Sequence, residues 1–142
     1  MRDPGEGLRR LGWTLAGLLA ALGPHFRYLH LWVTALALGI CAWRLLAERR
    51  GWRLPGAWTR GVIAIAVTAG VAFGYRTIAG LEAGTALLTL MAALKLLETR
   101  GPRDHVVLIF IGWFLCLAAF FYDQGLLTLA WVLPTVWLLA AA

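Results

Sequence analysis

Apolar residues occur along the chain in six runs, separated by short stretches rich in charged residues, glycine or proline. Several runs approach the roughly 20 residues that an α-helix needs to cross the hydrocarbon core of a bilayer. The runs lack the strict alternation of apolar and polar residues that marks the strands of a membrane barrel. The pattern therefore predicts α-helices at residues 11–26, 28–47, 61–78, 83–97, 106–122 and 125–142.

Together these elements predict an all-α membrane protein, a polytopic bundle of about six short transmembrane helices. Some runs are shorter than a full crossing, but a long basic side chain near a helix end can bury its stem and extend its charge to the interface. Arg44 and Lys95 occupy such positions. On this interpretation, residues 1–10 form a cytoplasmic N-terminal segment and residues 11–142 form the transmembrane helical domain.

Basic residues fall in alternate connections between the predicted helices. Apart from Arg27 and Arg76, every Lys and Arg lies near the N-terminus, near the connection 47–61, or near the connection 97–106. Lys and Arg are enriched in the cytoplasmic loops of membrane proteins. Six crossings with a cytoplasmic N-terminus place all three basic clusters on the cytoplasmic side, so the charges and the apolar runs predict the same topology.

The first predicted helix also has features of a signal peptide, because Arg9 and Arg10 precede its apolar stretch. Two observations argue against cleavage: Asp3 and Glu6 dilute the positive region, and no clean A-x-A site follows. A retained anchor is the favoured interpretation, and a cleaved segment is the alternative.

Composition supports a membrane environment. Hydrophobic residues make up 61% of the chain and charged residues 14%, and the mean hydropathy is +0.77. A soluble domain carries about a quarter charged residues, so this chain has too little polar surface to coat a globule in water. The net charge of +6 fits cytoplasmic loops beside lipid headgroups. The lipid bilayer is the expected partner, with no nucleic acid; other membrane or periplasmic partners and the oligomeric state are left open.

Residues able to support catalysis are scarce. The chain contains no serine, which excludes a serine nucleophile. Cys41 and Cys116 lie inside apolar runs without CxxC spacing, and a thiolate is disfavoured there. His25, His30 and His105 show no ligand spacing with a carboxylate. We therefore predict no catalytic residue, no metal and no cofactor in this chain.

Three charged residues at the two ends of the apolar run 83–97 have two interpretations. Glu82 can be a charge matched to a helix N-terminus, and Lys95 and Glu98 an i,i+3 surface pair. Alternatively, because ionisable residues at membrane depth are often functional, the three can form a polar core or a partner contact. The residues alone leave both interpretations open.

Glycine spacing predicts one close helix pair. Gly70 and Gly74 are four residues apart, as are Gly80 and Gly84, and the two pairs flank a short turn. Small residues at this spacing let membrane helices approach closely. We therefore expect residues 61–78 and 83–97 to form a close antiparallel hairpin.

A series of motifs carries a family resemblance. E-A-G at 82–84 is followed by L-K-L-L-E at 94–98, R-D at 103–104, F-I-G-W-F at 110–114 and Q-G-L-L at 124–127. In this order and spacing the chain resembles the N-terminal membrane region of bacterial TgpA-type transglutaminase-like proteins, over about residues 15–140. The resemblance marks these positions as family-pattern residues of unknown role: Glu82, Gly84, Lys95, Glu98, Arg103, Asp104 and Gln124.

The resemblance implies a role for the chain. In that family a periplasmic transglutaminase-like, papain-like cysteine domain follows the membrane helices and holds the catalytic Cys, His and Asp. None of those positions occurs here, and the sequence stops within the apolar residues 138–142, which predicts a fragment of a longer protein. The chain is expected to anchor and scaffold such a domain in the bacterial inner membrane. The alternative is a freestanding small membrane protein, either an interaction subunit or transporter-like.

Overall fold

The structure, a computed structural model, describes residues 4–76, 79–99 and 101–142. Over these residues the chain forms six α-helices and one 3-10 helix, without a strand. The elements are α1 (Pro4–Leu22), η1 (Gly23–Arg27), α2 (Leu31–Arg50), α3 (Ala57–Tyr75), α4 (Leu81–Glu98), α5 (Pro102–Tyr122) and α6 (Leu126–Ala140). The prediction of an all-helical chain with six main helices is confirmed.

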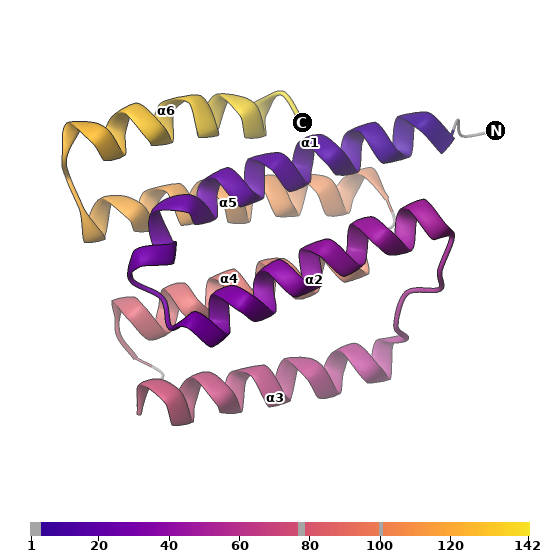
Figure 1. Ribbon diagram of the computed structural model, residues 1–142, viewed down its shortest axis with the longest axis horizontal. Helices are drawn as coiled ribbons and strands as arrows, with labels where there is room; N and C mark the ends of the chain where they lie inside the picture. The colour runs from indigo at the N-terminus through magenta and orange to yellow at the C-terminus, as the bar shows by residue number, and fades with distance from the viewer. Residues whose placement is uncertain (1–3, 77–78, 100) are drawn as a thin grey trace.

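Successive helices run back and forth in one bundle (Figure 1). Helix α4 packs against α2, α3 and α5, whereas α1 packs against α5 and α6. Helices α3 and α6 lie at opposite edges (Figure 1). Because the helices alternate in direction, the N-terminal ends of α1, α3 and α5 share one end of the bundle with the C-terminal ends of α2, α4 and α6. This is called the basic end below; the opposite end carries η1 and the α5–α6 turn.

Several helices extend beyond the predicted apolar runs into charged sequence. Helix α1 begins at Pro4, before the run at 11–26, and α5 begins at Pro102. Proline suits the first turn of a helix, because the missing N–H has no intrahelical partner there. Helix α2 continues to Arg50 and ends where Gly51 adopts a left-handed conformation, with φ of 63°. Hydrophobic runs therefore locate these helices but underestimate their ends.

Part of the sequence prediction lies outside the described residues. The third predicted helix ended at residue 78, whereas α3 ends at Tyr75 and residues 77 and 78 are outside the described part. Arg2 and Arg100, which contribute to the predicted charge asymmetry, are also outside it.

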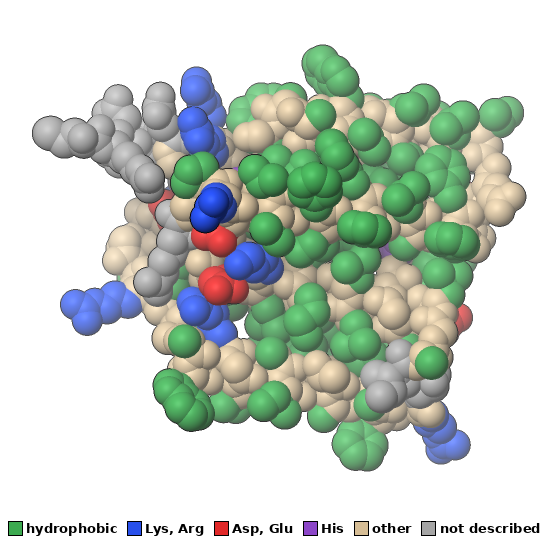
Figure 2. All heavy atoms as spheres, turned by 180° about the vertical axis from the view of Figure 1, so that it is seen from behind, with side chains coloured by type: hydrophobic (Ala, Val, Ile, Leu, Met, Phe, Trp, Pro, Cys, Tyr) green, Lys and Arg blue, Asp and Glu red, His purple; other side chains and the backbone are tan. Residues whose placement is uncertain are grey.

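Helix α4 forms the centre of the core. Its buried positions are small or aliphatic, as at Ala83, Ala86 and Leu90, so neighbouring helices approach it closely. Apolar side chains also cover the outside of the bundle, where Phe73 is 85% and Leu127 86% exposed. Figure 2 shows such side chains over most of one face. Exposed apolar surface of this extent marks contact with a membrane or another protein.

Three helices are long and apolar enough to cross a membrane, namely α2, α3 and α5. Helices α1 and α4 have similar lengths, 19 and 18 residues, but are not among these candidates. Helix α6 is apolar but only 15 residues long. Length and composition thus identify three candidate spans within the six-helix bundle.

The glycines predicted to join α3 and α4 have different neighbours. Helices α3 and α4 do pack together, but a Cβ on Gly70 or Gly74 would meet the ring of Trp32 in α2, at 3.5 and 3.6 Å. Gly84 has no such neighbour within 4 Å. Gly80 precedes α4 with φ of 135°, a conformation that suits glycine. The small face of α3 therefore accommodates the Trp32 indole.

A close helix contact joins α1, α5 and α6. A Cβ on Gly17 would lie 2.5 Å from Leu139 Cδ2, and one on Gly112 would lie 2.8 Å from Leu139 Cδ1. Leu139 is fully buried between them. A methyl group at either glycine would therefore force the Leu139 side chain to move, and Gly112 belongs to the F-I-G-W-F motif.

Candidate functional site

A salt-bridge cluster joins α4 to α5 at the basic end. Lys95 Nζ lies 3.2 Å from Glu98 Oε2 and 3.2 Å from Asp104 Oδ1. Asp104 also accepts a hydrogen bond from the backbone N–H of Gly101 at 3.2 Å, which caps the start of α5. The Lys95 side chain is 25% exposed, so the cluster is partly shielded. The i,i+3 pair expected from the sequence is present, and it extends to a contact between helices.

Arg44 forms a second polar link at this end, between α2 and α4. Its Nε donates to the carbonyl of Leu96 at 3.2 Å, and its Nη2 donates to the carbonyl of Thr99 at 3.3 Å. Its Nη1 pairs with Glu48 Oε2 at 2.6 Å. Carbonyls in the last turn of a helix lack intrahelical donors and attract positive charge. Arg44 is 6% exposed, so the expectation that it extends outward to an interface is wrong.

Thr14 of α1 connects to the same region. Its hydroxyl donates to the carbonyl of Arg10 at 2.9 Å and lies 3.1 Å from Nδ1 of His105. Because the single hydroxyl proton is used on Arg10, His105 Nδ1 donates to the Thr14 oxygen. Four helices, α1, α2, α4 and α5, therefore meet in one polar layer. Figure 2 shows charged side chains gathered at this end of the visible face.

The structure divides the family-pattern residues between the two ends. Lys95, Glu98 and Asp104 come together at the basic end, where Arg103 is exposed. Glu82, Gly84 and Gln124 lie toward the opposite end, and none of these three is buried. Glu82 occupies the first turn of α4, as its helix-end interpretation predicts. The sequence analysis did not predict that Arg44 is buried against α4. The sequence feature that could have indicated its pairing is the i,i+4 spacing from Glu48.

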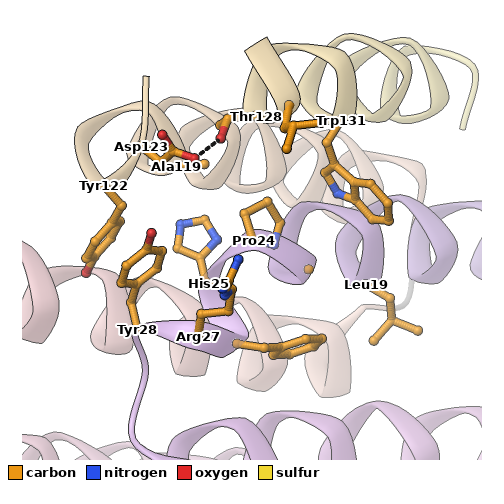
Figure 3. Close-up of a pocket in the computed structure, with 13 residues that line it drawn as sticks. Leu19, Pro24, His25, Arg27, Tyr28, Ala119, Tyr122, Asp123, Thr128 and Trp131 are labelled. Carbon is orange, nitrogen blue, oxygen red and sulfur yellow. Dashed lines mark hydrogen bonds between the residues drawn. The ribbon is translucent and has the colours of Figure 1, made fainter. Parts of the chain in front are cut away.

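At the opposite end the chain forms a cavity of about 620 Å³ between η1, α5 and α6. Figure 3 shows side chains from all three elements around it. One wall forms around Pro24. Because proline has no N–H, the carbonyl of Ala20, four residues earlier, lacks its helical donor. Trp131 Nε1 donates to that carbonyl at 2.9 Å, and its ring lies against Gly23, where a Cβ would be 3.1 Å away.

His25 lines this cavity and is fully buried. Its Nδ1 lies 3.1 Å from the carbonyl of Ala21, which only accepts, so Nδ1 carries the proton. Burial lowers the pKa of His25 below its ordinary value of 6.5 and favours the neutral ring. Nε2 is then an acceptor, and it has no hydrogen-bond partner among the described residues.

The α5–α6 turn supplies the other polar wall. The ring of Tyr122 stacks on Tyr28 with centroids 4.6 Å apart, and its hydroxyl donates to Thr85 of α4 at 3.2 Å. Asp123 Oδ2 accepts from the Thr128 hydroxyl at 2.8 Å. That bond, a second one from the N–H of Gly125 and the charge of Arg27 lower the pKa of Asp123. This carboxylate is exposed and ionised at neutral pH.

Cysteine and metal chemistry have little support in the described residues. Cys41 and Cys116 are both buried free thiols. No group of three or more His, Cys, Asp or Glu residues is arranged to hold a metal ion in the described part of the chain. The bundle thus presents a polar layer at one end and a cavity at the other.

Fold and sites together define a helical bundle with an apolar exterior and a strongly polarised charge distribution. The chain belongs to the TgpA N-terminal domain family, whose pattern it matches over residues 13–142. It is also similar to a protein-glutamine gamma-glutamyltransferase of Pseudomonas aeruginosa, with 36% identity over 132 residues. This match covers 92% of the chain but 20% of the relative, so the chain spans about a fifth of that protein's length. No solved structure matches the chain.

Proposed function

We propose that this chain is the membrane domain of a transglutaminase-like protein of the bacterial inner membrane. It crosses the bilayer six times, with residues 1–10 and the basic end in the cytoplasm, and scaffolds a catalytic domain on the periplasmic side. The segregation of basic residues to one end of an apolar bundle carries the proposal, because such asymmetry orients membrane proteins. The lipid bilayer is the partner in this proposal.

Two further observations support an anchoring role. The matched relative is named for glutamyl transfer, and this chain corresponds to only 20% of it. A transglutaminase-like nucleophile is an accessible cysteine activated by a base. Cys41 and Cys116 are 6% and 3% exposed, and neither hydrogen-bonds to a histidine in the described part of the structure. The proposal therefore assigns the chemistry to polypeptide outside the matched region.

Three helices meet the length and composition expected of a crossing, and the charged residues of α1 and α4 lie near the helix ends. The charges of α4 lie at its two ends, where they reach an interface or pair with α5. Helix α6 is short for a 30 Å core, but local thinning of the bilayer accommodates such a segment at modest cost. A six-crossing bundle is thus consistent with its charged helix ends.

Site-directed labelling tests the topology. Cys41 and Cys116 are replaced by alanine, and one cysteine is introduced at either Trp52 or Gln124, which lie at opposite ends and are both exposed. A membrane-impermeant maleimide is added to spheroplasts before and after permeabilisation. We expect Gln124→Cys to react in intact spheroplasts and Trp52→Cys to react only after permeabilisation.

The reverse labelling pattern contradicts the proposed orientation. Labelling of both positions in intact spheroplasts contradicts the proposed odd number of crossings between them, and recovery of the chain in the soluble fraction contradicts a membrane domain altogether. A cysteine at Arg76, which shares the end of Gln124, serves as a second reporter and must agree with it.

A further inference from the structure

The cavity beside His25 combines an apolar wall with charged groups. Its apolar side includes Leu127, Trp131 and Phe26, which are 86%, 52% and 42% exposed. These side chains face outward beside the cavity, where an acyl chain in the surrounding membrane could lie along them. A ligand in this position would therefore contact apolar surface and polar groups at once.

The polar side of the cavity offers one cation and two acceptors. Arg27 lines it, and Figure 3 shows its side chain extending along the wall toward His25. Arg27 makes no ion pair with Asp123 or with any other described residue, so its guanidinium donors are free for an anion. Arginine binds phosphate oxygens well, because its donors match their geometry.

The acceptors are the two carboxylate oxygens of Asp123. Asp123 is exposed, and each of its oxygens retains a lone pair beyond its bonds to Gly125 and Thr128. A cationic ligand group that donates hydrogen bonds is therefore favoured beside this carboxylate. A primary ammonium group supplies both charge and donors.

From this geometry we propose that the cavity binds a phospholipid whose headgroup carries a phosphate and a primary ammonium group. Arg27 holds the phosphate, Asp123 receives the ammonium, and the acyl chains run along Leu127 and Trp131. The volume of about 620 Å³ suits a headgroup and its glycerol. The inference rests on the proposed membrane placement, which puts this cavity at the periplasmic interface.

Native mass spectrometry of the chain in detergent micelles tests the site. The probes are dioleoyl phosphatidylethanolamine, dioleoyl phosphatidylglycerol and soluble phosphoethanolamine. We expect one phosphatidylethanolamine per chain, held about tenfold more tightly than phosphatidylglycerol, since a hydrogen bond to a charged group is worth roughly one such factor. Arg27→Gln should weaken phosphatidylethanolamine about tenfold, whereas Arg76→Gln, an exposed arginine at the same end, should not change it.

Asp123→Asn provides a variant of altered selectivity, because it removes a charge with little change in shape. It should reduce the preference for phosphatidylethanolamine over phosphatidylglycerol, an effect that general loss of structure does not produce. Equal binding of the two lipids by the wild type overturns the proposal, as does equal weakening by Arg27→Gln and Arg76→Gln. Binding of phosphoethanolamine as tight as that of the lipid overturns the lipid assignment. Since micelles have no sidedness, these results do not depend on the labelling experiment.

Discussion

Lys95 Nζ and Asp104 Oδ1 lie 3.2 Å apart, so the last turn of α4 is tied to the first turn of α5 across a tight connection. The same ammonium group pairs with Glu98 at 3.2 Å. One lysine thus neutralises two carboxylates that the connection brings together. Its removal leaves those two carboxylates close to each other.

Lys95→Met is expected to lower the free energy of unfolding by about 0.5–1 kcal/mol, because the bridges are partly exposed and solvent screens them. In a chain of 142 residues this corresponds to a fall in melting temperature of roughly 1–4 °C. Thermal unfolding in detergent measures it. A double-mutant cycle with Asp104→Asn should show coupling, and strictly additive effects contradict a direct interaction.

Arg44→Met is expected to cost more, about 2–3 kcal/mol, because it leaves the last carbonyls of α4 and the Glu48 carboxylate without their donor. Arg44→Lys should recover little of this loss, since an ammonium cannot donate to Leu96, Thr99 and Glu48 with the same planar geometry. Chemical denaturation in mixed micelles compares the variants. Arg49→Met is the matched control, because Arg49 is exposed on the same helix; equal losses at both positions argue against the buried network.

Gly112→Ala and Gly17→Ala should each destabilise the chain by about 1–3 kcal/mol, because the added methyl group overlaps the buried Leu139 side chain. Gly84→Ala is the control, with no neighbour within 4 Å of the added atom. It should be neutral or stabilising by up to about 1 kcal/mol, as glycine is a poor residue inside a helix. The loss of stability in the double variant Leu139→Ala with Gly112→Ala should be smaller than the sum of the two single losses. Additive losses contradict this contact.

His25 predicts a pH dependence of stability. Its pKa is lowered by burial in the folded chain, so the unfolded chain binds more protons as the pH falls below the ordinary value of 6.5. Stability should therefore be level above about pH 7 and decline from there toward about pH 5. His25→Gln should flatten this decline, measured as melting temperature against pH. Asp123 titrates at lower pH and does not interfere, since its pKa is lowered as well. An unchanged profile in the variant contradicts a buried neutral His25.

The sequence predicted the elements and their order, since each helix coincides with an apolar run and the turns with Gly, Pro and charged residues. It also predicted the basic end, because charges in alternate connections of an antiparallel bundle must meet. Glu82 was interpreted as a charge matched to a helix N-terminus, and the structure places it in the first turn of α4. These features follow from local pattern and from the simplest topology.

Contacts between residues distant in sequence were not predictable in the same way. Arg44 was expected to extend outward, and nothing in its own run shows that the carbonyls of Leu96 and Thr99 lie beside it. The cavity depends on Trp131 meeting Ala20, more than a hundred positions earlier. Glycine spacing located a small surface on α3, but the partner that fills it, Trp32, is identified only by the packed fold.

The packing of α1 against α5 and α6 has a consequence for how the chain is made. If the helices enter the membrane in order of synthesis, the first is in lipid before its two main neighbours have left the ribosome. Two polar groups of the first helix then lack a later partner: Thr14, whose partner His105 belongs to the fifth helix, and the Ala20 carbonyl, whose donor Trp131 belongs to the sixth. The Thr14 hydroxyl already donates to the carbonyl of Arg10 within its own helix. Thr14 thus keeps a hydrogen-bond partner through that interval, whereas the Ala20 carbonyl gains its donor only when the last helix packs.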